Sequence, residues 1–172
     1  MTTAPLILTL KLDQSSFDRF TALRQQYFPP ERNFLSAHIT LFHALPGEQI
    51  IPIQETLSSV CSQTAQLPLQ FPQLRFLGRG VAVEVASPQL KQLRQQLAQA
   101  WQSWLTAQDR QGYRPHITIQ NKVSSTEARQ VYAQLSQSWQ PSNGQGEGLL
   151  LWHYQGGPWQ LATQVLFTST TP

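Results

Sequence analysis

The sequence is poor in cysteine and in charged residues, and both shortages limit what the protein can be. Cys61 is the only cysteine among 172 residues, so no disulfide can form within the chain. This fits a reducing compartment, and we expect a cytoplasmic protein. Charged residues make up only 12% of the chain, against about a quarter in an average protein. The net charge of +3 favours anionic ligands, but it is too small for the dense basic surface that binds duplex nucleic acid.

Long apolar runs and common cofactor motifs are also absent. No run approaches the ~18 apolar residues that a membrane-spanning helix needs, so we expect no membrane segment. The short apolar stretch at residues 6–8 has no basic residue before it, which argues against a signal peptide. There is no glycine-rich phosphate loop, and the histidines do not follow a metal-site spacing such as H-x-H or H-E-x-x-H. We therefore expect no cofactor and no metal.

The spacing of apolar residues predicts an α+β protein. Alternation with a period of two marks strands, and apolar residues three or four positions apart mark helices. At this length the chain fits one domain, or two small lobes that share a core. Glycines and a proline at residues 141–148 predict a flexible connector. Strands are predicted at 5–12, 38–45, 67–76, 81–85, 116–119, 149–154 and 160–168, and helices at 16–28, 52–65, 88–105 and 125–135.

One short motif occurs twice. The tetrapeptide His-Ile-Thr-Leu at residues 38–41 returns as His-Ile-Thr-Ile at residues 116–119. Side chains two positions apart in a strand point to the same face of the sheet. The histidine and threonine of each copy therefore face one way, and the aliphatic residues face the core. The motif predicts two strands that each offer an imidazole and a hydroxyl.

An imidazole and a hydroxyl from each strand suit chemistry at a phosphate. Histidine titrates near neutral pH, so His38 and His116 could serve as general base and general acid. The hydroxyls of Thr40 and Thr118 could donate hydrogen bonds to phosphate oxygens and stabilise the charge that develops there. The alternative is that both histidines are ordinary half-buried strand residues bonded to backbone carbonyl groups.

Four blocks of sequence together resemble a known family. They are residues 37–42 and 113–123, which contain the two motifs, and residues 76–82 and 151–159. These blocks are similar to the 2H phosphoesterase superfamily, and in particular to its bacterial 2′-5′ RNA ligase-like, or LigT-like, family. The resemblance implies a single two-lobed α+β domain over residues 1–172, with pseudo-two-fold antiparallel sheets flanked by helices. Each lobe would give one motif strand to a central groove.

The resemblance also implies an activity. It implies a metal-independent phosphodiesterase that acts on 2′,3′-cyclic phosphates or 2′-5′ phosphodiester bonds of RNA or nucleotides, and that in reverse ligates RNA through a 2′-5′ bond. In hydrolysis, His116 would be the base for the attacking water and His38 the acid for the leaving ribose oxygen. RNA ends or cyclic nucleotides would be the partners of a monomer. The alternative is an RNA- or nucleotide-binding module that keeps the groove but performs little chemistry. Histidine in both motifs favours the enzyme.

Three further residues are predicted to bind substrate. Phe42 extends the His38 face of its strand, and Tyr113 precedes the second motif, so either ring could stack on a base. Lys122 has the same parity as His116 and could bring positive charge to the phosphate if the strand continues. For the two aromatic rings, packing in the core is the alternative.

Other residues are weaker candidates. His43 is an odd number of positions after the first motif histidine, so a regular strand would turn it away from the groove, and His153 is expected to be structural or exposed. Arg79 and Arg114 could contribute charge, although most arginines lie on the solvated surface. Many ligase-like relatives carry an arginine just after the second motif, where residues 120–122 of this chain are Gln-Asn-Lys.

Overall fold

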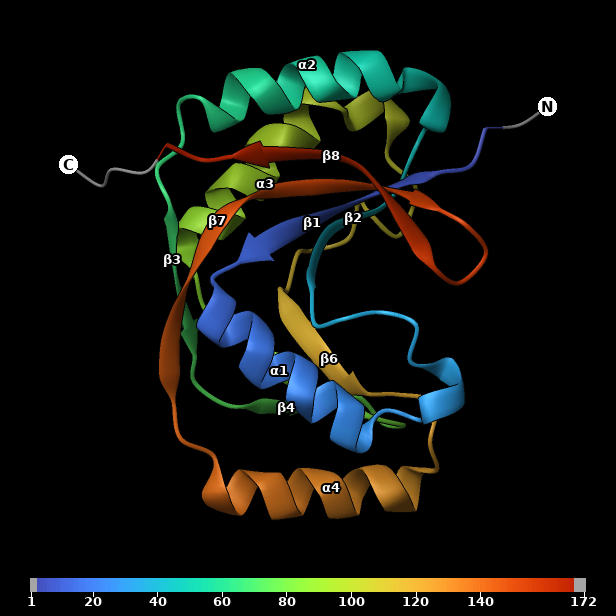
Figure 1. Cartoon of the computed structure of the whole chain (residues 1–172), viewed down its shortest axis with the longest axis vertical. Helices are drawn as coiled ribbons and strands as arrows, with labels where there is room; N and C mark the ends of the chain where they lie inside the picture. The colour runs from blue at the N-terminus through green and yellow to red at the C-terminus, as the bar shows by residue number, and fades with distance from the viewer. Residues whose placement is uncertain (1–2, 169–172) are drawn as a thin grey trace.

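Residues 3–168, the part of the chain that the computed structural model describes, form two antiparallel sheets and four α-helices (Figure 1). In the larger sheet, β2, β1, β7 and β3 lie in that order, and β8 also pairs with β7. One edge of the long strand β7 pairs with β1. Its other edge pairs with β3 in the first part of the strand and with β8 in the rest. The strands of the larger sheet are β1 (Leu6–Leu12), β2 (Ile39–Leu45), β3 (Leu67–Phe71), β7 (Ser142–Tyr154) and β8 (Trp159–Leu166).

The smaller sheet consists of β4 (Leu74–Phe76), β5 (Val81–Glu84) and β6 (His116–Gln120), in that order. Gly78, in the turn between β4 and β5, has a φ of +87°, a conformation that glycine adopts without a steric penalty. The first motif leads into β2 at an edge of the larger sheet, and the second motif begins β6 at an edge of the smaller sheet. The topology thus keeps the two motifs on different sheets.

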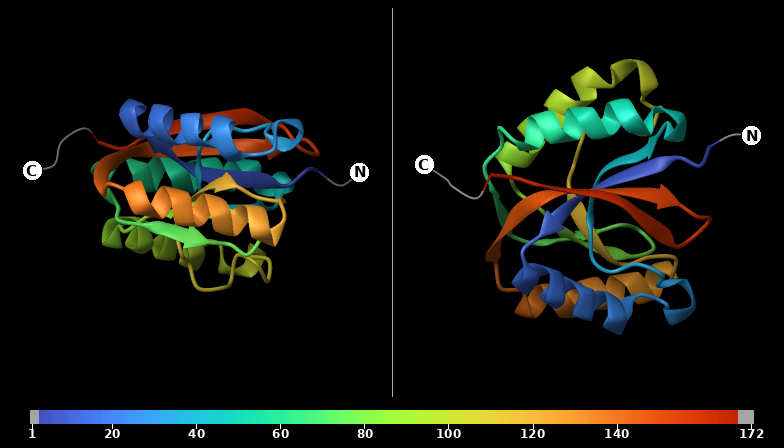
Figure 2. Two further views of the ribbon diagram at one scale, coloured as in Figure 1. Left: turned by 90° about the horizontal axis from the view of Figure 1, so that it is seen from below. Right: turned by 45° about the horizontal axis from the view of Figure 1, so that its top comes forward.

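The helices lie at two ends of the molecule, α2 and α3 beside the larger sheet and α1 and α4 beside the smaller one (Figures 1 and 2). α1 follows β1 of the larger sheet but packs against β6 of the smaller sheet, which ties the sheets together. The side chains of Asp13, Ser87 and Ser124 cap α1, α3 and α4 by accepting a hydrogen bond from a backbone N–H of the first turn. The helices are α1 (Gln14–Tyr27), α2 (Ile50–Cys61), α3 (Pro88–Ala100) and α4 (Ser125–Ser138).

The α+β class and the four predicted helices are confirmed, but the predicted strand at 67–76 and the predicted connector at 141–148 are wrong. The predicted strand at 67–76 divides into β3 and β4, which belong to different sheets and flank Pro72, a residue with no N–H to donate to a sheet. The predicted connector at 141–148 is instead the first half of β7. A Cβ at Gly146 would lie 2.8 Å from the side chain of Leu10. The glycines that suggested a loop therefore allow β7 to pack closely against its neighbours.

One hydrophobic core contains side chains from both sheets. It includes the aliphatic residues of both motifs, Ile39, Leu41, Ile117 and Ile119, which are at most 1% exposed. Burying one such side chain stabilises the fold by about 1.5–3 kcal/mol. The core therefore fixes which face of each motif strand remains accessible.

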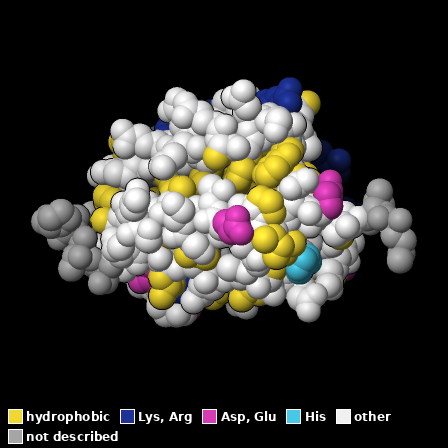
Figure 3. Space-filling model, turned by 90° about the horizontal axis from the view of Figure 1, so that it is seen from above, with side chains coloured by type: hydrophobic (Ala, Val, Ile, Leu, Met, Phe, Trp, Pro, Cys, Tyr) yellow, Lys and Arg dark blue, Asp and Glu magenta, His cyan; other side chains and the backbone are white. Residues whose placement is uncertain are grey.

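The surface reflects the low content of charged residues. The face seen from above α2 carries few charged side chains, with exposed apolar areas between the polar ones (Figure 3). None of the helices within residues 3–168 has the length and apolar character that crossing a membrane would require.

Candidate active site

The two motif histidines are held in the same way. Nδ1 of His38 lies 2.8 Å from the carbonyl oxygen of Ser36, and Nδ1 of His116 lies 2.9 Å from the carbonyl oxygen of Arg114. A carbonyl oxygen can only accept, so we assign the proton of each neutral ring to Nδ1. Each imidazole then keeps Nε2 for a ligand. The bond to a backbone carbonyl, which the sequence offered as a purely structural alternative, here also orients the ring.

Both histidines and both threonines of the motifs line one space of about 440 Å³, which we call the central cleft. His38 and Thr40 enter it from β2 and the loop before it, and His116 and Thr118 enter it from β6. Trp159, at the start of β8, also lines the cleft and packs its ring edge-on against His38, with 4.8 Å between ring centroids. Two motifs that are far apart in the sequence therefore meet in one cavity.

Arg24 of α1 connects the loop before the first motif to the second motif. It is 3% exposed, and its Nε donates to Asn33 Oδ1 and to the carbonyl oxygen of Leu35, both at 3.1 Å. Its Nη1 donates to the carbonyl oxygen of Thr118 at 2.9 Å. Burial lowers the pKa of Arg24 to about 10, so the guanidinium stays charged at neutral pH. This cation was not among the sequence predictions, because its partners are carbonyl and amide oxygens from distant segments.

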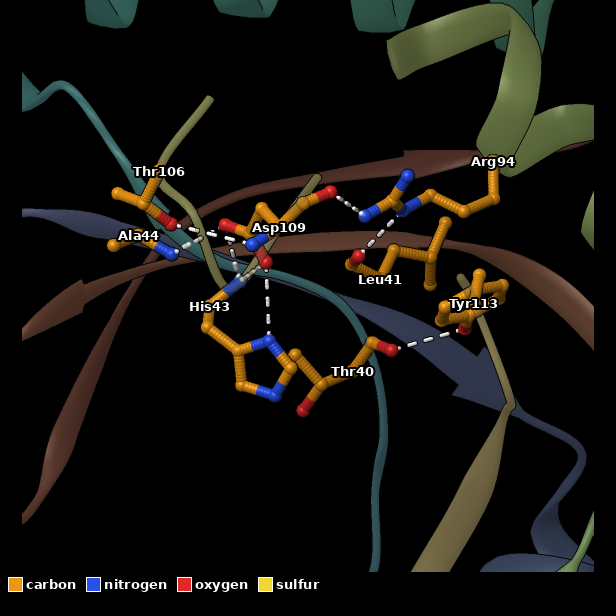
Figure 4. Close-up of polar contacts among 8 residues, drawn as sticks. All are labelled: Thr40, Leu41, His43, Ala44, Arg94, Thr106, Asp109 and Tyr113. Atoms are coloured by element: carbon orange, nitrogen blue, oxygen red, sulfur yellow. Dashed lines mark hydrogen bonds and ion pairs between the residues drawn. The ribbon is translucent and has the colours of Figure 1, made fainter. Parts of the chain in front are cut away.

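Arg94 of α3 makes the reciprocal connection (Figure 4). Its Nε donates to the carbonyl oxygen of Leu41 at 2.8 Å, and its Nη2 donates to the carbonyl oxygen of Asp109 at 2.6 Å. It therefore links the first motif to the loop before the second. Tyr113 adds a parallel link, since its hydroxyl donates to the carbonyl oxygen of Thr40 at 2.9 Å. Together, the two buried arginines fix the two motif segments relative to each other.

The surroundings of the histidines disfavour the imidazolium form in the absence of a ligand. Burial lowers the pKa of His38 to about 4, with smaller contributions from Arg24 and the other histidines of the cleft. Burial also lowers the pKa of His116, and Arg75, His43 and Arg114 act in the same direction. Both rings are therefore neutral at pH 7 in the free protein.

Arg75 of β4 is a cleft residue that the sequence analysis missed. Its Nη1 lies 3.3 Å from Nδ1 of His116, and its Nε donates to Glu84 at 2.9 Å. The strand register explains its position: Ala82 of β5 pairs with Arg75 on one side and with Thr118 on the other. Residues opposite one another in neighbouring strands share a face. Only the order of strands in the smaller sheet, which the sequence pattern does not give, brings Arg75 to the second motif.

The prediction that Phe42 would face the groove is wrong. Phe42 is fully buried, and its ring packs edge-on against Trp101 at 5.2 Å between centroids. The register of β1 with β2 gives the reason: Leu8 pairs with Phe42, but the next residue of β1 pairs with Thr40. Leu41 is thus an extra residue in β2, a β-bulge that breaks the alternation of faces. Leu41 and Phe42 both enter the core as a result.

The same bulge corrects the prediction for His43. Beyond the extra residue the parity of β2 is reversed, and His43 lines the central cleft instead of turning away from it. Its Nδ1 lies 3.1 Å from Oδ1 of Asp109. A bulge has no reliable sequence signal here, so the alternation rule failed at this position.

Two of the four remaining candidates for substrate binding line the cleft and two do not. Tyr113 lines the cleft, so base stacking by its ring stays a prediction. Lys122 does not line the cleft: β6 ends at Gln120, and Lys122 is exposed with a φ of +64°, outside the extended conformation on which its parity argument depended. Arg114 lines the cleft, whereas Arg79 does not.

The fold and the cleft together define an α+β protein of the LigT-like 2H phosphoesterase kind. The chain belongs to the 2′-5′ RNA ligase superfamily, whose family model matches residues 12–158. The family resemblance inferred from the two motifs is thereby confirmed. No curated protein sequence matches the chain with statistical significance.

Solved structures share the whole fold at low sequence identity. The chain is similar to the protein TT0787 of Thermus thermophilus, with a TM-score of 0.70 and 12% identity over 97% of this chain and 100% of that one. It is also similar to LigT of Escherichia coli in complex with 3′-AMP, with a TM-score of 0.60 and 17% identity over 97% and 99% of the two chains. A structure described as a phosphoesterase gives a TM-score of 0.59 at 18% identity over 97% and 99%.

Proposed function

We propose that this protein is a phosphodiesterase that acts on 2′,3′-cyclic phosphates or 2′-5′ phosphodiester bonds of RNA or nucleotides. The observation that carries the proposal is the pair of imidazoles in one cleft, each held through Nδ1 so that Nε2 can serve a substrate. Membership of the 2′-5′ RNA ligase superfamily supports the choice of bond. The 3′-AMP in the complex of Escherichia coli LigT is a ribose phosphate, which supports this class of ligand.

The two motif histidines and the two motif threonines then each have a role in hydrolysis of a 2′,3′-cyclic phosphate. Nε2 of His116 accepts a proton from the attacking water as the water oxygen bonds to phosphorus. Nε2–H of His38 gives a proton to O3′ as the P–O3′ bond breaks, and the product is a 2′-phosphate. Thr40 and Thr118 donate hydrogen bonds to the non-bridging oxygens, where negative charge increases. Ligation is the reverse reaction, with the two imidazoles exchanging roles.

Substrate binding favours the protonated form of His38 that the acid role needs. In the free protein the pKa of His38 is about 4, so its ring is neutral. A phosphate anion beside the ring favours the charged form and raises that pKa. A phosphate in the cleft therefore increases the fraction of His38 that carries a proton on both ring nitrogens, the second proton being taken from solvent.

The test is turnover of a 2′,3′-cyclic mononucleotide by the wild-type protein, His38→Ala and His116→Ala. We expect each substitution to lower kcat by at least ~10²-fold, the low end of general acid–base effects. His153→Ala is the matched control, because His153 lies outside the cleft and should keep the wild-type rate. Activity should persist in EDTA without ATP. Loss on chelation that a divalent ion restores would contradict the metal-independent chemistry.

A binding module with the same groove is the second candidate function. It would bind a nucleoside 2′-monophosphate with both histidines intact yet turn over no cyclic phosphate. Binding without turnover in the wild-type protein would favour it over the enzyme.

A further inference from the structure

Asp109 holds His43 in a fixed orientation at the wall of the central cleft (Figure 4). The Asp109 carboxylate is 1% exposed and accepts hydrogen bonds from the backbone N–H of His43 at 2.9 Å and of Ala44 at 3.0 Å, as well as from Nδ1 of His43. Burial alone would raise the pKa of Asp109, but these donors outweigh it and hold the pKa below its usual value. The ionised carboxylate therefore fixes the proton on Nδ1 of His43.

The rest of the His43 ring is accessible. The side chain is 47% exposed, and Nε2 is the ring nitrogen turned away from Asp109, on the side where Thr40 also projects (Figure 4). A buried carboxylate that orients an exposed imidazole is the usual way to fix a functional tautomer.

Cationic and donor groups gather near His116. Arg75, His43 and Arg114 line the central cleft with His116, and Nη1 of Arg75 lies 3.3 Å from Nδ1 of His116. Glu84 pairs with Arg75 at 2.9 Å and lies 3.6 Å from Arg114, which offsets part of this charge. Arg94, also in the wall, is already bonded to two backbone carbonyls.

His38 has a different environment. It packs against the Trp159 ring, and the charges of Arg24 and His43 both act on it. The donors of the buried Arg24 are already bonded to Asn33 Oδ1 and to the Leu35 and Thr118 carbonyls. The reacting phosphate is already served by the two motif imidazoles and the two hydroxyls. The central cleft thus has donors beyond those that a single phosphate needs.

We propose that His43, oriented by Asp109, binds a second phosphate group of the substrate, distinct from the reacting one. The contact uses the imidazolium form, in which Nδ1–H donates to Asp109 and Nε2–H donates to a phosphate oxygen. This inference rests on the proposed function and narrows it. The substrate is then a nucleotide with another phosphate attached to its terminal ribose, such as the last nucleotide of an RNA chain, rather than a cyclic mononucleotide. Arg75 and Arg114 add positive charge around the same group.

Calorimetric binding of two non-reacting ligands tests the proposal without turnover. Uridine 2′,5′-bisphosphate carries the second phosphate, and uridine 2′-monophosphate lacks it. The wild-type protein should prefer the bisphosphate, and His43→Gln should reduce that preference roughly tenfold, as expected for one charge-assisted hydrogen bond. Asp109→Asn should reduce it less, with the fold checked by circular dichroism. His153→Gln should leave it unchanged.

Two outcomes overturn the proposal. An unchanged preference in His43→Gln would show that the ring does not contact a second phosphate. An equal loss of affinity for both ligands would place His43 at the reacting phosphate instead. Failure of the proposed function has a different signature: no turnover of either a cyclic mononucleotide or a dinucleotide ending in a cyclic phosphate, while the binding preference and its loss in His43→Gln remain.

Discussion

The two motif histidines share a sequence context but not an electrostatic one. Both donate Nδ1–H to the carbonyl of the residue two positions earlier. His38, however, packs against an indole ring, whereas His116 lies beside a guanidinium. Identical tetrapeptide patterns therefore give two imidazoles that are suited to different roles. The difference comes from their surroundings in the tertiary structure.

Protein stability should report the lowered pKa of His38. The pKa is about 4 in the folded protein and 6.5 without perturbation, so between these values the unfolded chain binds more protons. Stability therefore falls as the pH drops from 6.5 towards 4, and His116 contributes with the same sign. Urea unfolding at about pH 7.5 and about pH 5 should show this fall, and a smaller fall in His38→Gln. An equal fall in both proteins would contradict the lowered pKa.

The assignment of acid and base can be tested through the leaving group. A substrate with a much better leaving group at the 3′ position needs little protonation of that oxygen. It should restore the rate of His38→Ala far more than that of His116→Ala. Steady-state rates for the two variants on both substrates give the comparison. Rescue of His116→Ala alone would make His116 the acid and His38 the base, with both histidines still catalytic.

The β2 strand determines which side chains enter the site. Its bulge at Leu41 places Phe42 in the core and His43 in the cleft, the reverse of the regular alternation. An inserted residue exchanges the faces of the side chains that follow it, here as far as a second register shift before Leu45. The bulge at Leu41 accounts for both wrong predictions on β2.

Phe42→Ala should destabilise the fold by ~3–5 kcal/mol, the usual cost of emptying a buried aromatic position. The loss has a second source, because the guanidinium of Arg94 lies over the Phe42 ring at 4.0 Å. Phe34→Ala is the matched control, since that ring is 61% exposed and its loss should cost less than ~0.5 kcal/mol. Urea unfolding measures both values. Similar values for the two variants would mean that Phe42 is not a core residue.

Local pattern predicted much of the fold and part of the site. The motif tetrapeptides and the apolar spacing indicated the α+β class and the positions of His38, Thr40, His116 and Thr118 on one face of each strand. The bulge, the entry of β4 into another sheet, and Arg75 beside the second motif depend on pairing between distant segments. Single-sequence periodicity carries no information on such pairing.

In the molecule as a whole, Arg24 and Arg94 couple the two motif segments. Each comes from a helix and bonds one motif strand together with the loop that leads to the other motif. The charge of Arg94 interacts with the Asp109 carboxylate, whereas the charge of Arg24 contributes to the lowered pKa of His38. The same groups therefore set both the geometry and the charge balance of the cleft.

Arg24→Met should separate the effect of Arg24 on the geometry of the cleft from its effect on the pKa of His38. The lost bonds to Leu35 and Thr118 should let the motif segments shift, and a displacement of about 1 Å can cost on the order of 10²-fold in rate. Loss of the cation should also raise the pKa of His38, measured by NMR titration. Arg19→Met, on the same helix but outside the cleft, should change neither value. A slower enzyme with an unchanged His38 titration would leave Arg24 a purely structural role.

The pairing of β1 with the late strand β7 has a consequence for the order in which the sheet forms during synthesis. β1 carries β2 and the first motif, and the other edge of β1 is covered only by β7, which leaves the ribosome long after both of them. Such long-range pairing forms slowly, because the intervening chain must be closed into a loop first. A nascent chain that already contains both motifs still lacks the strand that completes the sheet behind the first one. The sheet behind the first motif is therefore completed only after β7 has been synthesised.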